Sequence, residues 1–113
     1  MARINEGSLE RVLVKTNGHF VLVPTSEIDW IEAQGNYVRL HARKKQYVVR
    51  RSIKAFESRL KGNHFARIHR SVIVNLDRVL ELQPLSHGDL KVVLSDGTHL
   101  TWSRTYKSKL KEF

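Results

Sequence analysis

Residues 65–75 carry the most informative pattern of the chain, and their sequence is FARIHRSVIVN. The polar triplet His69-Arg70-Ser71 interrupts apolar residues, and a β-branched run follows it. Short apolar runs between polar residues are typical of strands that are covered on both faces. The triplet is therefore predicted to form a turn or kink between two buried strands. From that support its side chains could reach phosphates and base edges. Equally, His69 and Ser71 could bond only to the local backbone while Arg70 is solvated.

Hairpins are predicted on both sides of this stretch. Asn17-Gly18 and Gly35-Asn36 each separate two β-rich segments. Both residue types tolerate the positive φ that two-residue hairpin loops need. With the two strands of the central stretch, the predicted strands are 11–16, 19–24, 28–34, 37–42, 46–51, 79–84, 90–94 and 99–102. About ten short antiparallel strands predict a mainly β fold of small sheets, although the strand count alone also allows a barrel or a sandwich.

One helix is predicted at residues 52–61. Ser52 is a suitable N-cap, because its hydroxyl can accept a free backbone N–H. One apolar stripe at helical spacing is formed by Ile53, Phe56 and Leu60. This stripe is expected to pack on the sheets, and the basic residues of the segment lack a repeated exposed face, so it is not predicted to be a DNA-recognition helix. The Lys-rich tail 103–113 could add a short closing helix.

Composition predicts a single domain over residues 9–113, with residues 1–8 as a leader or linker remnant. The 113 residues include no Cys, which excludes disulfides and thiolate metal sites and suits a reducing cytoplasm. No secretory signal is visible, and no apolar run approaches the roughly 18 residues of a membrane span. A cytoplasmic protein is therefore expected.

The net charge of +9 is unevenly distributed. Residues 41–70 contain ten Lys or Arg against one acid, Glu57, whereas residues 76–100 contain two basic and four acidic residues. A polarised basic surface predicts a polyanionic partner. Nucleic acid is the first candidate. A membrane surface is the second, but no basic segment has the amphipathic helical pattern that such binding requires.

Catalysis is not expected. Nucleophilic catalysis needs a nucleophile, a base and an orienting group, and the chain has no Gly-rich phosphate loop, G-x-S-x-G motif or paired carboxylates. The six His residues are scattered. His64 and His69 are five residues apart without a nearby acidic ligand, unlike zinc-binding pairs on a helix. No catalytic residue, metal site or cofactor is therefore predicted.

Three motifs in order resemble the LytTR-type DNA-binding domain of bacterial transcriptional regulators. In chain order, the first is IDWIEAQGNYV at 28–38, which resembles the family's I-x-x-I-E-A-x-x-x-Y-V. The second is Arg67-x-His69-Arg70-Ser71, followed by VIVN. The third is LTWSR at 100–104, which resembles the closing V-S-R element. Order and spacing agree over residues 10–111. The resemblance implies an elongated arrangement of three antiparallel sheets. It also implies the output domain of a transcriptional regulator, such as a two-component response regulator.

The resemblance further implies that loops enter successive major grooves and that the DNA bends. Base contacts are expected from Asn36, Tyr37, Arg70 and Arg104. Backbone contacts are expected from His69, Ser71, Ser103, Thr105 and Lys107, and, on charge grounds, from Arg39, Arg50 and Arg51. An Arg guanidinium can bond guanine O6 and N7 together, and an Asn amide can do the same for adenine N6 and N7. Double-stranded DNA, a second copy on paired DNA sites and an upstream sensory or receiver domain are the expected partners.

Two further expectations concern the basic and aromatic residues. The five cations Arg43, Lys44, Lys45, Arg50 and Arg51 are predicted to lie near phosphates, although a run of charges can equally be solvated. An RNA or single-strand binder is the alternative function, because such modules stack bases on exposed aromatic side chains. The candidates for stacking are Trp30, Trp102, Tyr37, Tyr47 and Tyr106, of which Trp30 is expected in the core. A module for protein interaction only would leave the positive charge unexplained.

Overall fold

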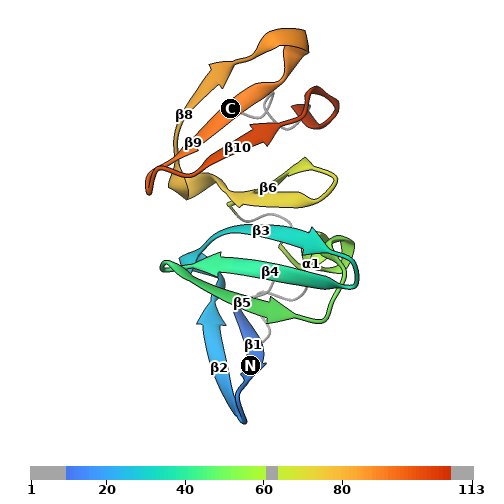
Figure 1. Ribbon diagram of the computed structural model, residues 1–113, viewed down its shortest axis with the longest axis vertical. Coiled ribbons are helices and arrows are strands. Elements are labelled where there is room, and N and C mark those ends of the chain that lie inside the picture. The colour runs from blue at the N-terminus through green and yellow to red at the C-terminus, as the bar shows by residue number, and fades with distance from the viewer. Residues whose placement is uncertain (1–9, 61–63, 108–113) are drawn as a thin grey trace, which may run out of the picture.

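The computed structural model describes residues 10–60 and 64–107. Ten antiparallel strands form three small sheets with one short α-helix, in a body of 45 × 32 × 25 Å (Figure 1). The predicted mainly β, elongated fold is confirmed. A barrel and a sandwich are excluded, because three separate sheets follow one another along the long axis.

The first sheet is a two-stranded ribbon of β1 (Arg11–Thr16) and β2 (His19–Pro24). Asn17 and Gly18 join the strands with φ values of 42° and 83°, as the Asn-Gly pair predicts. Alternate residues of the ribbon point to the protein interior, where Val12, Val14 and Val23 are buried.

The central sheet has five strands in the order β5-β4-β3-β7-β6. Its strands are β3 (Ile28–Gln34), β4 (Tyr37–Ala42), β5 (Lys45–Val49), β6 (Phe65–His69) and β7 (Val72–Asn75). The predicted strand 46–51 is thus placed too late. Arg43 and Lys44 form the preceding turn with φ values of 52° and 64°, so β5 already begins at Lys45 and ends before Arg50.

The third sheet has the order β10-β9-β8 and contains β8 (Val79–Pro84), β9 (Leu90–Leu94) and β10 (His99–Trp102). Short 3-10 turns precede β3 (Thr25–Glu27), link β7 to β8 (Leu76–Arg78) and lie between β8 and β9 (Ser86–Gly88).

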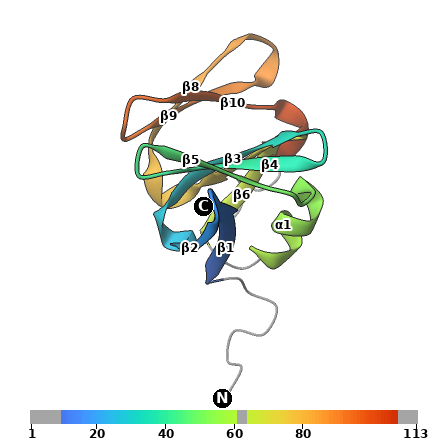
Figure 2. The same ribbon diagram turned by 60° about the horizontal axis from the view of Figure 1, so that its bottom comes forward.

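The third sheet lies on one face of the central sheet, and the ribbon and the helix lie on the other (Figure 2). Each face packs into a separate hydrophobic core. Ile31, Leu40 and Phe56 belong to the core shared with the ribbon and the helix. Ile68 and Trp102 belong to the core shared with the third sheet. Trp30, which was expected inside, is only half-buried at the margin of the second core. The central sheet is therefore covered on both faces, as the continuous apolar run of β7 predicts.

The predicted helix exists as α1 (Ile53–Arg59), shorter than 52–61 because Ser52 is its N-cap and Leu60 its C-cap. The apolar stripe faces the core, with Phe56 and Leu60 buried. Residues 104–107, at the start of the segment for which a closing helix was predicted, form one 3-10 turn. Residues 108–113 lie outside the described residues, so the closing helix stays a prediction. Among the described helices none is long and apolar enough to cross a membrane.

The N-cap gives the first testable prediction. Ser52 Oγ accepts a hydrogen bond from the Ala55 N–H at 3.1 Å. Ser52→Ala is expected to lower the free energy of unfolding by about 1 kcal/mol, because that N–H loses its partner. Urea unfolding followed by circular dichroism measures the change. Ser58→Ala is the matched control, since the Ser58 hydroxyl only bonds back to the Ala55 carbonyl within the helix. Equal losses for both variants would contradict the capping role.

Candidate nucleic-acid interface

Strand register gathers the predicted contact residues on one side of the central sheet, where β3, β5 and β6 end. We call this side, formed by strand ends and turns, an edge. The β3–β4 turn, the end of β5 and the β6–β7 turn all meet there, because Gln34 pairs with Tyr37, Val38 with Val49, and Glu32 with Val72. A hydrogen bond from Ala33 N–H to the Ser71 carbonyl, 2.8 Å long, joins two of these parts. Figure 1 shows this edge along the right-hand side of the molecule.

A β-bulge brings the third sheet to the same edge. Arg67 pairs with Ile73 and His69 with Val72, which leaves Ile68 as an extra residue in β6. The Ile68 carbonyl accepts a hydrogen bond from the Ser103 N–H at 2.8 Å, directly after β10. Bulges redirect backbone groups in this way. Arg70 and Arg104, which are 34 positions apart in the sequence, consequently share one edge.

Arg104 lies against the loop between β8 and β9. Its N–H donates to Asp89 Oδ1 at 3.0 Å, and its Nη1 donates to the His87 carbonyl at 3.3 Å. A side chain on Gly88 would come within 3.5 Å of the Arg104 side chain. Arg104 is exposed, so its guanidinium is oriented by the loop yet open to solvent.

The polar triplet is locally bonded. His69 Nδ1 accepts the Ser71 N–H at 3.1 Å and lies 2.9 Å from Ser71 Oγ. This matches the local-backbone alternative for His69 and Ser71, with Arg70 exposed at the turn. Because Nδ1 accepts, a neutral His69 ring carries its proton on Nε2.

The first turn presents Asn36 and Tyr37, and both are exposed. The Arg50 guanidinium lies 6.0 Å from the centre of the Tyr37 ring, a cation–π distance. Arg51 stands similarly over Phe56, at 5.7 Å. Each arginine of the pair that follows β5 thus lies within cation–π distance of an aromatic ring.

Arg39 and His41 are already engaged within the protein. Arg39 lies two residues in from the edge, where its guanidinium donates to Gln34 Oε1 at 2.6 Å and to Gln46 Oε1 at 2.9 Å. Its Nε is buried and has no hydrogen-bond partner among the residues that the structure describes. The His41 ring stacks on Trp30 at 3.9 Å between centroids. The side chains of Arg39 and His41 on β4 are therefore bonded within the protein, whereas Arg50 and Arg51 remain exposed.

We call the segments bearing Arg50, Arg51, Arg70, Arg104 and Lys107 the cationic edge. The opposite edge holds ion pairs, including Arg78 with Asp29 at 2.9 Å and Arg43 with Glu27. There the backbone and side chain of Thr98 lower the pKa of the Asp96 carboxyl by hydrogen bonding, with a smaller contribution from Lys44. The basic residues of segment 43–51 therefore lie at the two ends of β5, with Arg43, Lys44 and Lys45 at one end and Arg50 and Arg51 at the other. Their contact with phosphates stays a prediction.

Arg67, His87 and Asp89 are structural residues of the site for which no role was predicted. Arg67 Nε donates to the His69 carbonyl at 2.8 Å, and the other two residues contact Arg104. Arg67 belongs to the Arg67-x-His69-Arg70-Ser71 motif, so its place in the sequence contained a signal for its role. The loop residues gave no signal, because only tertiary structure brings them to Arg104.

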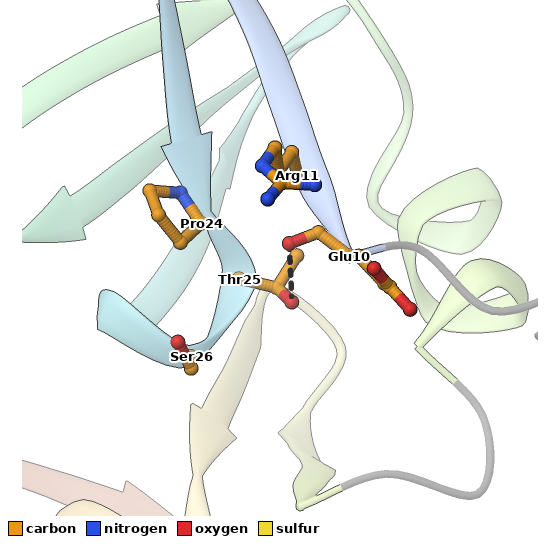
Figure 3. A pocket seen from close by; sticks show the side chains of 5 residues that line it. All are labelled: Glu10, Arg11, Pro24, Thr25 and Ser26. Carbon is orange, nitrogen blue, oxygen red and sulfur yellow. Dashed lines mark hydrogen bonds between the residues drawn. The ribbon is translucent and has the colours of Figure 1, made fainter.

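A depression at the base of the ribbon shows no catalytic arrangement (Figure 3). Its lining residues are Glu10, Arg11, Pro24, Thr25 and Ser26. The Thr25 hydroxyl donates to the Glu10 carbonyl at 3.2 Å, a structural bond. Across residues 10–60 and 64–107, no group of three or more His, Asp or Glu side chains is arranged to hold a metal ion.

Comparison with known protein families shows the family of this chain. The family model described as LytTr DNA-binding domain matches residues 18–113. The chain belongs to the LytTR family of DNA-binding domains. It is thus a DNA-binding domain and not an enzyme, and the resemblance drawn from the three motifs is confirmed.

Relatives and solved structures agree with this membership. The LytTR domain is 29% identical over 92 residues to the sensory transduction protein LytT of Bacillus subtilis (strain 168), covering 81% of this chain and 38% of that protein. It is 33% identical over 94 residues to the transcriptional regulatory protein YpdB of Escherichia coli (strain K12), covering 82% and 37%. A LytTr DNA-binding domain structure from Bacillus cereus superposes with a TM-score of 0.82 at 26% identity, covering 93% of this chain and 96% of the other. The chain spans less than half the length of these curated relatives.

Proposed function

We propose that this LytTR domain is the sequence-specific output domain of a bacterial transcriptional regulator and that it binds double-stranded DNA through its cationic edge. The observation that carries the proposal is the meeting of Arg70 and Arg104 at one edge, although they come from different sheets. Had they lain on opposite sides of the molecule, one duplex could not contact both.

The turns at this edge would contact the base edges and so recognise the DNA sequence. Arg70 and Arg104 are exposed guanidinium groups that can each bond one guanine, while Asn36 and Tyr37 present the first turn to another base pair. Phosphates would be bound through charge by Arg50, Arg51 and Lys107. Hydrogen bonds to phosphate oxygens would come from His69, Ser71, Ser103 and Thr105. Arg39 would join them once its guanidinium is released from Gln34 and Gln46.

The shape of the protein supports contacts with successive major grooves. The longest dimension is 45 Å, and the edge runs along it (Figure 1). One turn of B-DNA occupies about 34 Å. Loops spaced along such an edge can enter neighbouring grooves, and bending the DNA toward the protein would bring the outer loops into contact.

Arg104→Ala tests the reading role directly. Duplexes bound by the unaltered protein are first enriched from a random-sequence pool. The variant is expected to lose about 1–3 kcal/mol of affinity for the enriched duplex and to lose its preference at one base pair. Gel-shift titrations on the enriched duplex and on single-substitution duplexes measure both effects. Equal weakening on every sequence would make Arg104 a phosphate contact instead.

Single-strand or RNA binding is the weaker alternative. Trp102 is fully buried, Trp30 stacks on His41, and Tyr106 lies beneath Arg67. Of the five predicted stacking residues only Tyr37 counts as an exposed large side chain. A stacking platform needs several such rings along one groove. Titrations with duplex DNA, single-stranded DNA and RNA of one sequence should therefore favour the duplex.

The surrounding protein is part of the same proposal. Because the chain spans less than half of its curated relatives, we propose that a sensory or receiver domain adjoins it through residues 1–8, which lie outside the described residues. We further propose that two copies occupy paired sites on the DNA of the bacterial cytoplasm, with residues 9–113 as the DNA-binding unit.

A further inference from the structure

One largely buried arginine contacts three parts of the structure that meet at the cationic edge. Arg67 belongs to β6, and its side chain is 15% exposed. Nε donates to the His69 carbonyl at 2.8 Å, and Nη2 donates to the Arg70 carbonyl. Nη1 donates to Glu57 Oε1 of helix α1 at 2.7 Å. The guanidinium carbon also lies 5.8 Å from the centre of the Tyr106 ring, in the 3-10 turn after β10.

The β6–β7 turn differs in conformation from the other two-residue hairpin turns of the protein. Two-residue hairpin loops favour turns with positive φ, since their twist matches that of the strands. Asn17-Gly18 and Arg43-Lys44 follow this rule, but neither Arg70 nor Ser71 has a positive φ. The bulge at Ile68 and the bonds from Arg67 to two turn carbonyls accompany this departure.

We propose that Arg67 is a positioning residue for DNA recognition. It holds the β6–β7 turn against helix α1 and against the 3-10 turn that begins at Arg104, so that Arg70 and Arg104 keep the relative placement that base recognition requires. The proposal rests on the proposed function. Arg67 is not itself a phosphate contact, because its guanidinium is enclosed and bonded on each of its three nitrogens.

The geometry requires arginine. A guanidinium is a planar fork with five donors, whereas a Lys ammonium is a compact charge that cannot span three separate acceptors. Arg67→Lys therefore keeps the charge and removes the link, while Arg67→Met removes both. Lys45→Met is the matched control for the lost charge, because Lys45 is exposed at the opposite edge.

The test measures the affinity of each protein for the duplex enriched from a random pool and for a shuffled duplex, over a series of salt concentrations. Both Arg67 variants are expected to bind the enriched duplex at least about tenfold more weakly, which is about 1.4 kcal/mol. On the shuffled duplex, Arg67→Met should bind with the same affinity as Lys45→Met. Arg67→Lys should bind the shuffled duplex with the same affinity as the unaltered protein. The slope of log affinity against log salt should stay that of these reference proteins.

Three outcomes separate the possibilities. A slope reduced by about 0.9 in Arg67→Met relative to Lys45→Met, with equal losses on both duplexes, would make Arg67 a phosphate contact and overturn the proposal. Unchanged binding by both variants would overturn it as well. Failure of the unaltered protein to enrich any duplex would instead refute the proposed function, before any variant is compared.

A measurement without DNA covers the case in which Arg67→Met does not fold. Amide hydrogen exchange by NMR reports on the Ser71 N–H, which bonds to His69 Nδ1. In free Arg67→Lys this exchange is expected to be faster than in the unaltered protein, while exchange in the centre of β7 is retained. Equal exchange at Ser71 in the two proteins would show that Arg67 does not hold the turn.

Discussion

Replacing Arg70 and Arg104 together with alanine is expected to abolish most sequence preference. Each bidentate arginine contributes about 1–3 kcal/mol of discrimination, so the double variant should lose about 2–6 kcal/mol on the enriched duplex. Both side chains are exposed and, within residues 10–60 and 64–107, neither is in an ion pair with a carboxylate, so their removal should leave the fold intact. Fluorescence anisotropy with labelled enriched and shuffled duplexes measures the change.

A matched control removes the same charge elsewhere. Lys44→Ala combined with Lys45→Ala takes two cations from the opposite edge, where both residues are exposed. This control should weaken both duplexes alike and keep their affinity ratio. If it lowers the ratio as much as the arginine variant does, the cationic edge is not the reading surface. The two single arginine variants complete a cycle that shows whether the side chains act independently.

Raising the salt concentration should have the second large effect. With three to five phosphates neutralised by cationic-edge residues and their neighbours, the slope of log affinity against log salt is about −2.7 to −4.5. Between 50 and 200 mM salt the affinity should then fall about 40- to 500-fold. Titrations in KCl measure it. Each displaced counterion comes from a phosphate, so Arg50→Ala or Arg51→Ala should each reduce the slope by about 0.9.

A flat salt response would contradict the electrostatic part of the proposal. So would a slope that is unchanged in both Arg50→Ala and Arg51→Ala. An unchanged slope for one of them alone would assign that side chain to its aromatic partner, Tyr37 for Arg50 or Phe56 for Arg51. The Lys45→Met variant provides the baseline for loss of a charge outside the edge.

The strands were largely predictable, since each depends on a few adjacent residues. Asn17-Gly18 specifies its hairpin through positive φ, and the alternation of Val38, Leu40 and Ala42 specifies which face of β4 is buried. Ser52 specifies where the helix begins. The error at β5 arose because Arg43 and Lys44 adopt positive φ without being Gly or Asn.

The candidate site was predictable only as a set of residues. The three motifs indicated His69, Arg70, Ser103 and Arg104, but their common placement depends on the bulge at Ile68 and its bond to Ser103. The role of Arg67 is equally tertiary, because its partners lie on α1 and after β10 as well as in its own turn.

By itself the sequence determined the local elements, the family motifs and the excess of positive charge, because each of these depends on residue type and short-range spacing. Only the tertiary structure decided where the charges lie. Strand register sends Arg50 and Arg51 to one edge and Arg43 and Lys44 to the other, although they are close together in the chain. The length of β5 separates cations that are close together in the sequence. Strand register and the bulge at Ile68 bring Arg70 and Arg104 to the same edge.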